Sequence, residues 1–313
     1  MTESDETTTS FCNTPDGAKL AYCILGAEQN GVPLIMLTGI ASVKEDWDDL
    51  ATALALHRPV CIYDHRGIGA STLAPPLPPF KTTSSLTVTQ LATDTFTLVS
   101  HLQWRKFHLL GMSMGGMVAQ QLVLLLRGRD DYCVQSMTAL ATSARPRGGR
   151  HMAEYYGLLC DELESRKGGG KGKGKNEVEK VVRRFLEGNL TSRWCRENSE
   201  KVDEMMRSNA TARKPARVIV QQIEALSTGF DLTPQLALIN TPTLVIHGTH
   251  DEIIPLEHGH AIASGIRGAR FLPLRDVGHI TYRMDDGQTL RGVDEFMQEI
   301  DAKSAVASLT VKL

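Results

Sequence analysis

Ser113 lies in the stretch "GMSMGG", between an apolar run at 107–112 that predicts a strand and an apolar run at 117–126 that predicts a helix. A serine at the apex of a sharp strand-to-helix turn takes strained backbone angles, and its neighbours two positions away must be small. Gly111 and Gly115 meet this need. The start of the helix also brings backbone N–H groups to the place where an oxyanion would form. A plain turn serine is the alternative, but the flanking strand and helix favour a nucleophile.

A nucleophilic serine needs a base, and the base needs an acid that orients it. His279 in "LRDVGHITY" follows a late apolar run, and Asp251 in "VIHGTHDEIIP" follows another, 28 residues earlier. The chain order Ser, Asp, His is the one that a strand–turn–helix nucleophile requires. Glu252 is the second choice for the acid because its side chain is longer. His250 could assist, and His247, at the end of an apolar run, is expected to pack in the sheet. The other histidines, His65 among them, have no comparable setting.

The developing oxyanion also needs two hydrogen-bond donors. The run "IMLTGIAS" ends a predicted strand in a turn at Gly39, so the backbone N–H of Ile40 could join that of Met114 at the oxyanion. Backbone donors place no demand on the side chains. This chemistry requires neither a metal nor an organic cofactor.

Short apolar runs that predict strands recur along the chain, with helical spacing between the later ones. Continuous apolar strands separated by helices favour an α/β fold with a mostly parallel central sheet, covered by helices on both faces. The runs lie at 19–25, 33–38, 59–64, 107–112, 136–141, 242–248 and 269–274.

This alternation stops between residues 145 and 236, where the patterns are helical only. We therefore expect a core of residues 1–144 and 237–313, and an inserted helical cap of residues 145–236. Within the cap, the Gly/Lys-rich stretch at 166–177 predicts a flexible surface insertion rather than a helix. The residues proposed for a substrate pocket could instead pack within the fold; they are Gly39, Met112, Tyr155, Tyr156 and Trp194, with Phe185, Met205 and Met206 as further candidates.

Composition excludes several partners. The net charge of −2 over 313 residues gives no excess of positive charge that would attract nucleic acid. No apolar run reaches the length of about 18 residues that a membrane span needs. The six cysteines are scattered, which predicts buried free thiols rather than disulfides or a metal site. The acidic N-terminus differs from a signal peptide and indicates a cytoplasmic protein, and Val311-Lys312-Leu313 only partly matches a peroxisomal signal. No oligomeric state is predicted.

The motifs together resemble the α/β-hydrolase superfamily over nearly the whole chain. "GMSMGG" is similar to its nucleophile elbow, "YDHRGIGAST" to a turn shared by its esterases, lactonases and haloperoxidases, and the segment from Asp251 to His279 to its acid and base region. Aclacinomycin-methylesterase-like and enol-lactonase-like members are the most similar. The resemblance implies a triad of Ser113, Asp251 and His279, and a hydrolase for a medium-sized, mostly uncharged carboxylic ester or lactone.

Two features qualify this resemblance. Thr38 stands where many members have a histidine that braces the oxyanion loop. Asp64, Arg66, Gly67 and Gly69 of the "YDHRGIGAST" turn are interpreted as scaffold, not as substrate contacts.

Other functions remain open for the same triad. A perhydrolase or cofactor-free haloperoxidase, a carbon–carbon bond hydrolase and a ligand receptor that retains the triad are the alternatives. Epoxide hydrolases and dehalogenases fit poorly because they carry an aspartate in place of Ser113.

Overall fold

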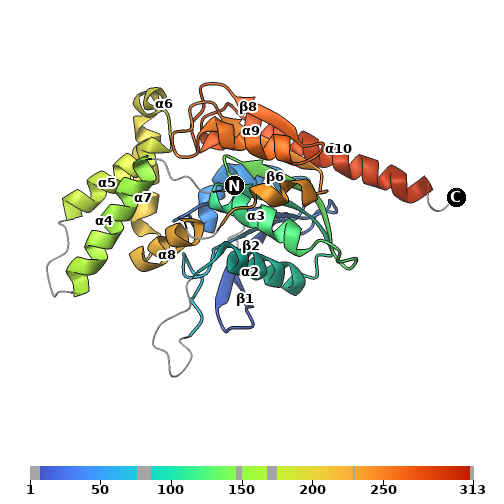
Figure 1. Cartoon of the computed structure of the whole chain (residues 1–313), viewed down its shortest axis with the longest axis horizontal. Helices are drawn as coiled ribbons and strands as arrows, with labels where there is room; N and C mark the ends of the chain where they lie inside the picture. Colours follow the sequence, from blue (N-terminus) through green and yellow to red (C-terminus); the bar gives the residue numbers. More distant parts are fainter. Residues whose placement is uncertain (1–7, 76–85, 146–149, 168–174, 228–229, 311–313) are drawn as a thin grey trace, which may run out of the picture.

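The computed structural model describes residues 8–75, 86–145, 150–167, 175–227 and 230–310. An eight-stranded sheet forms its centre, in the order β1-β2-β4-β3-β5-β6-β7-β8 (Figure 1). Strand β2 pairs antiparallel with β1 and β4, and every other pairing is parallel. The strands are β1 Ser10–Asn13, β2 Lys19–Leu25, β3 Leu34–Leu37, β4 Val60–Tyr63, β5 Lys106–Met112, β6 Cys133–Leu140, β7 Thr243–Gly248 and β8 Arg270–Leu274.

Helices cover both faces of this sheet. Leu34 and Met36 of β3 pack in one apolar cluster with α1 (Asp48–Leu54) and α10 (Gln288–Thr310). The alternate residues of β3, Ile35 and Leu37, belong to the cluster on the opposite face. That face carries α2 (Val88–His101), α3 (Met114–Leu125) and α9 (Leu256–Gly265). The predicted α/β class, with a mostly parallel sheet flanked by helices, is confirmed.

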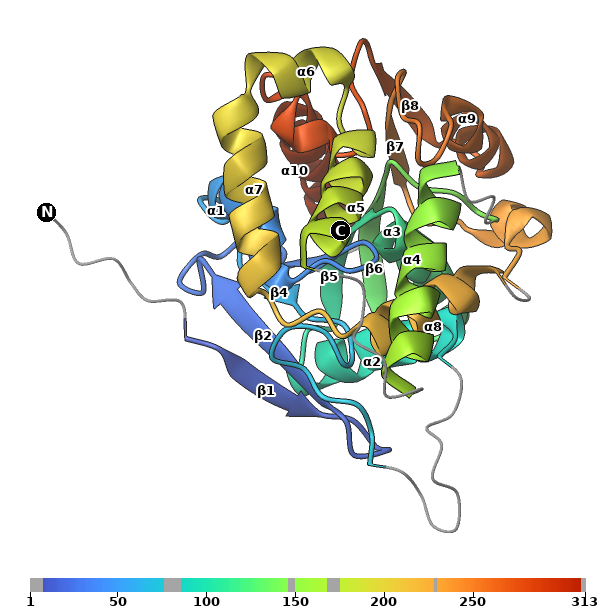
Figure 2. The same ribbon diagram turned by 90° about the vertical axis from the view of Figure 1, so that its left-hand side faces the viewer.

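Five helices intervene between β6 and β7: α4 Arg150–Lys167, α5 Lys175–Gly188, α6 Ser192–Glu197, α7 Ser199–Thr211 and α8 Ala216–Ser227. Figure 2 shows them on one side of the sheet. Among the described residues of 145–236 there is no strand. We call these five helices the cap, and its outer bounds of 145 and 236 stay a prediction. The described residues also form three short 3-10 helices: η1 Lys44–Trp47, η2 Thr233–Leu238 and η3 Thr281–Arg283.

Several expectations differ from the structure. Strand β1 was not predicted, because only Cys12 of its four side chains is buried and its sequence has no apolar run. The Gly/Lys-rich insertion is shorter than 166–177, since α4 extends to Lys167 and α5 begins at Lys175. The six cysteines are free, but only Cys12, Cys23 and Cys61 are buried.

Some expectations lie outside the described residues: the extreme N-terminus, the centre of the insertion and Val311-Lys312-Leu313. Within the part that is described, no helix is both long enough and apolar enough to cross a membrane.

Candidate active site

Ser113 connects β5 to α3 in a conformation that a non-glycine residue rarely adopts, with φ 55° and ψ −121°. The strained turn is tightly enclosed. A Cβ atom on Gly115 would lie 2.0 Å from the carbonyl oxygen of Leu37, and one on Gly111 would lie 2.3 Å from the carbonyl oxygen of Gly115. Both positions therefore need glycine, as predicted, because the start of α3 presses against the end of β3.

Asp251 and His279 form a buried pair, with 2.7 Å between Asp251 Oδ2 and His279 Nδ1. The other carboxylate oxygen of Asp251 accepts the backbone N–H groups of Ile253 and Ile254 at 2.9 and 2.8 Å. Burial raises the pKa of Asp251. The charge of His279 and hydrogen bonds from His247 and His279 outweigh burial, and they hold that pKa well below its ordinary range. The carboxylate is thus ionised at neutral pH and can orient the imidazole.

The loops that carry these two residues are pressed together. A Cβ atom on Gly248 would lie 2.2 Å from the carbonyl oxygen of Val277, so the acid-bearing loop approaches the histidine-bearing loop backbone to backbone. The cap also contributes here, because the carbonyl oxygen of Asn189 accepts the N–H groups of His279 and Ile280 at 2.9 and 3.1 Å. The position of His279 therefore depends on the residue that follows α5 as well as on the core.

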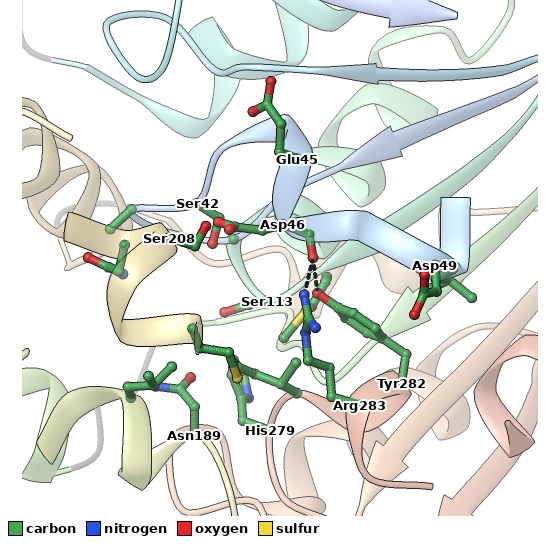
Figure 3. Close-up of a pocket in the computed structure, with 18 of the residues that line it drawn as sticks. Ser42, Glu45, Asp46, Asp49, Ser113, Asn189, Ser208, His279, Tyr282 and Arg283 are labelled. Carbon is green, nitrogen blue, oxygen red and sulfur yellow. Dashed lines mark hydrogen bonds between the residues drawn. The ribbon is translucent and has the colours of Figure 1, made fainter. Parts of the chain in front are cut away.

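Ser113 and His279 line the same cavity (Figure 3). Both residues are among those described, and no hydrogen bond within 3.5 Å joins the Ser113 hydroxyl to His279. Hydrogen bonds between catalytic groups often tighten only when substrate is bound.

The segment Thr38–Ala41, here called the oxyanion loop, lies against the serine. A Cβ atom on Gly39 would be 3.7 Å from Ser113 Oγ, and Ile40 lines the cavity. Met114 opens α3, and the N–H groups of a first helical turn have no partner within the helix. The backbone of both predicted donors, Ile40 and Met114, is therefore adjacent to the nucleophile.

A supporting contact made by His65 was missed in the sequence. Its Nε2 lies 3.1 Å from the carbonyl oxygen of Thr38, and burial lowers the pKa of this histidine to about 4. The ring is therefore neutral at pH 7, and its Nε2–H donates to Thr38. Strands β3 and β4 pair in parallel, so the residues after each strand meet at one edge. The sequence signal for this contact was the place of His65 in the "YDHRGIGAST" turn, directly after β4.

The cavity measures about 960 Å³ and runs from Ser113 and His279 to the cap, whose Tyr155 and Trp194 also line it. Of the predicted pocket residues, Gly39, Met112, Tyr155 and Trp194 line it, as do Phe185 and Met205. Tyr156 does not, because its hydroxyl instead donates to Glu224 at the surface, 3.2 Å away. Met206 also lies outside the lining. Neighbours one position apart on a helix face different directions. This explains why Tyr155 and Met205 line the cavity whereas Tyr156 and Met206 do not.

A polar wall of the cavity was missed in the sequence. Lys214 Nζ lies 3.5 Å from the carboxylate of Asp46. The hydroxyl of Tyr282 donates to the backbone oxygen of Asp46 at 2.8 Å (Figure 3). Further charged or polar residues that line the cavity are Glu45, Asp49, Lys201, Glu204, Ser208, Asn209 and Arg283. The lining therefore includes charged as well as apolar side chains.

Residues 32–271 match the family model described as serine aminopeptidase, S33 (Hydrolase_4). The chain belongs to this family. A solved hydrolase from Pseudomonas aeruginosa PA01 is similar over 94% of this chain and 99% of its own, with 29% identity and a TM-score of 0.74. The enol-lactonase from Burkholderia xenovorans LB400 has the same fold, with a TM-score of 0.73 at 23% identity over 93% of this chain and 100% of that one. The resemblance to α/β-hydrolases is confirmed.

Two named relatives are similar in sequence. "Putative carbamate hydrolase RutD" of Pseudomonas savastanoi pv. phaseolicola is 26% identical over 250 residues, covering 79% of this chain and 86% of that protein. "3-oxoadipate enol-lactonase 2" of Acinetobacter baylyi is 26% identical over 209 residues, covering 66% and 67% respectively. Together with the family, these relatives make the protein an α/β-hydrolase enzyme.

The "YDHRGIGAST" turn of this hydrolase is scaffold. Asp64 is fully buried and accepts the backbone N–H groups of Lys44 and Ala70 at 2.8 and 2.9 Å. Arg66 forms an ion pair with Asp94 on α2, and none of these groups lines the cavity.

Among the described residues, no group of three or more His, Cys, Asp or Glu side chains is placed to hold a metal ion.

Proposed function

We propose that this hydrolase cleaves a carboxylic ester or lactone through an acyl-enzyme intermediate. The observation that carries the proposal is the 2.7 Å pair of Asp251 and His279, because His279 lines the same cavity as a serine on a strained strand-to-helix turn. The glycine loop beside that serine supports an oxyanion site. This combination is the geometry of acyl transfer.

The proposed reaction starts with attack of Ser113 Oγ on the substrate carbonyl. His279 takes the serine proton on Nε2, while the ionised Asp251 holds the Nδ1–H tautomer and stabilises the imidazolium. The N–H groups of Ile40 and Met114 bind the oxyanion of the tetrahedral intermediate. As the intermediate collapses, the proton on His279 passes to the leaving oxygen. Water activated by the same histidine then releases the acid and regenerates Ser113.

The mixed apolar and charged lining of the cavity supports a substrate with an apolar part and a polar part. We place the apolar part against Tyr155, Phe185 and Trp194, and the polar part toward Asp46 and Lys214. The relatives named for carbamate hydrolysis and for enol-lactone hydrolysis give the substrate classes to test first. A carbamate would follow the same steps, with an amine or alkoxide as leaving group.

The test is a comparison of the wild type with Ser113→Ala, using a fluorophosphonate probe and p-nitrophenyl acetate. We expect the wild type to label and to hydrolyse the ester, and the variant to do neither, with turnover reduced by a factor of about 10⁴ or more. Labelling or turnover that survives in Ser113→Ala would refute the assignment of the nucleophile.

The competing functions give different outcomes in the same assay. A panel of esters, lactones and carbamates that yields labelling without turnover would favour a ligand receptor. Acyl transfer to peroxide that outruns transfer to water would favour a perhydrolase. Cleavage of a vinylogous diketone in preference to esters would favour a carbon–carbon bond hydrolase.

A further inference from the structure

The oxyanion loop is held at both of its ends. At its start, the carbonyl oxygen of Thr38 accepts the Nε2–H of His65 at 3.1 Å. At its end, the N–H of Ala41 donates to Oε1 of Gln222 at 3.0 Å. The peptide N–H of Ile40 lies between these two anchored groups, so the two side chains together determine where it points.

The end held by Gln222 is the strained one. Ala41 has a φ of 56°, in the left-handed region that disfavours residues with a Cβ atom. Such a conformation persists only where the surrounding structure holds it in place. Gln222 is 1% exposed, and its hydrogen bond to Ala41 is buried, so water cannot readily replace it.

Gln222 does not belong to the core. It lies on α8 of the cap, which packs against α4, the helix that carries the cavity-lining Tyr155. The segment before α8 also reaches the other anchor, because the backbone oxygen of Arg213 accepts the N–H of Gly69 at 2.8 Å. The guanidinium of Arg213 donates to the carbonyl oxygen of Gly67 at 3.2 Å. Both glycines belong to the turn that carries His65.

We infer that Gln222 is a positioning residue, through which the cap sets the direction of the Ile40 amide at the oxyanion. The inference rests on the proposed function. His65 and a cap glutamine together brace the loop, so the cap is part of the proposed catalytic apparatus as well as of the cavity lining.

The test compares Gln222→Met, which keeps the length of the side chain but removes the acceptor oxygen, with Gln222→Glu, which keeps an acceptor. For Gln222→Met we expect kcat on p-nitrophenyl acetate to fall by a factor of about 10 to 100, with KM changed less than about threefold, because oxyanion contacts act in the transition state. The affinity for a trifluoromethyl ketone, which forms an oxyanion on the enzyme, should fall by a similar factor. Gln222→Glu should keep kcat within about fivefold of the wild type, even where its melting temperature drops.

Gln135→Met is the matched control, because Gln135 is also buried but lies on β6 and donates to Ile300 on α10, outside the cavity. It should leave kcat and ketone affinity unchanged. If Gln222→Met does not melt cooperatively, Gln222→Ala replaces it, with the same expected loss. A kcat within twofold of the wild type in the acceptor-free variant, or an equal loss in Gln222→Glu, would overturn the inference. Failure of the proposed function looks different, since the wild type itself would then lack Ser113-dependent turnover.

Discussion

Two histidines, His247 and His279, contact Asp251, and a third, His250, precedes it in the chain. The surroundings of the three rings separate their roles. His279 lines the cavity and bonds to the carboxylate at 2.7 Å. His247 is fully buried; its Nε2 lies 2.7 Å from the carbonyl oxygen of Ile254 and 3.3 Å from Asp251, so it supports the acid without reaching substrate. His250 is exposed and lies 3.6 Å from Asp276. Only His279, of these three, can exchange a proton with a group in the cavity.

We therefore predict that His279→Gln reduces ester turnover by a factor of about 10³ or more, because the general base is lost. His250→Gln should keep kcat within about twofold, since its ring contacts only surface groups. Steady-state kinetics with p-nitrophenyl acetate measures both. A fully active His279→Gln would mean that another group is the base.

Residue types alone do not identify a triad in this chain. His108 lies between Ser136, 2.7 Å from its Nδ1, and Asp301, 3.1 Å from its Nε2. These three residues repeat the chemistry of the candidate site. Ser136 and His108 are fully buried, however, and none of the three lines the cavity. These hydrogen bonds therefore join the sheet to α10, and the three side chains have no access to a substrate in the cavity.

At the scale of elements, the contact between β3 and α3 positions the nucleophile. The absence of a side chain at Gly115 lets the start of α3 approach Leu37 at the end of β3. The same approach places Ser113 beside Gly39 of the oxyanion loop. One helix–strand contact therefore sets the positions of both Ser113 and the loop that we propose to bind the oxyanion.

Gly115→Ala should break this contact. The new Cβ atom would lie 2.0 Å from a backbone oxygen, so α3 must shift, which we expect to lower the free energy of unfolding by about 1–3 kcal/mol or more and to reduce turnover at least tenfold. Gly157→Ala in α4 is the control, because no atom lies within 4 Å of its added methyl group and alanine favours helix more than glycine does. Urea unfolding and ester kinetics measure both effects. Equal stability of the two variants would contradict the packing argument.

At the scale of the whole molecule, buried neutral histidines make stability depend on pH. Burial lowers the pKa of His65 to about 4, whereas an unfolded histidine titrates near about 6.5. Between these values the unfolded chain binds the proton and the folded chain does not, so the folded state loses stability as pH falls through this window. Burial also lowers the pKa of His108, which acts in the same direction.

From this shift we expect His65 to contribute a loss of about 2 kcal/mol in the free energy of unfolding between pH 7 and pH 5. In His65→Gln, which keeps a donor for Thr38, the pH dependence should shrink by that amount, while the part due to His108 remains. Urea unfolding of both proteins at pH 7 and pH 5 gives the comparison. An unchanged pH dependence in the variant would show that His65 is not the group responsible.

The sequence by itself determined the chemistry of the candidate site and the class of fold. Ser113 and its glycines form a local motif, Asp251 and His279 each follow an apolar strand, and parallel strands bring such positions to one edge of a sheet. Seven of the eight strands could be predicted from continuous apolar runs, although in β8 only Leu274 is buried. A short stretch of sequence was sufficient to predict the features that depend on neighbouring residues alone.

Tertiary structure alone decided how the site is supported and shaped. The two contacts that brace the oxyanion loop join residues 27 and 181 positions apart, Thr38 with His65 and Ala41 with Gln222. The polar wall likewise joins Asp46 to Lys214, 168 positions away. The Thr38–His65 contact depends on β3 and β4 being neighbours in the sheet. The contacts of Gln222 and Lys214 depend on how the cap packs on the sheet, which no periodicity or short motif encodes. The packing of the cap against the core thus decides which groups meet the substrate.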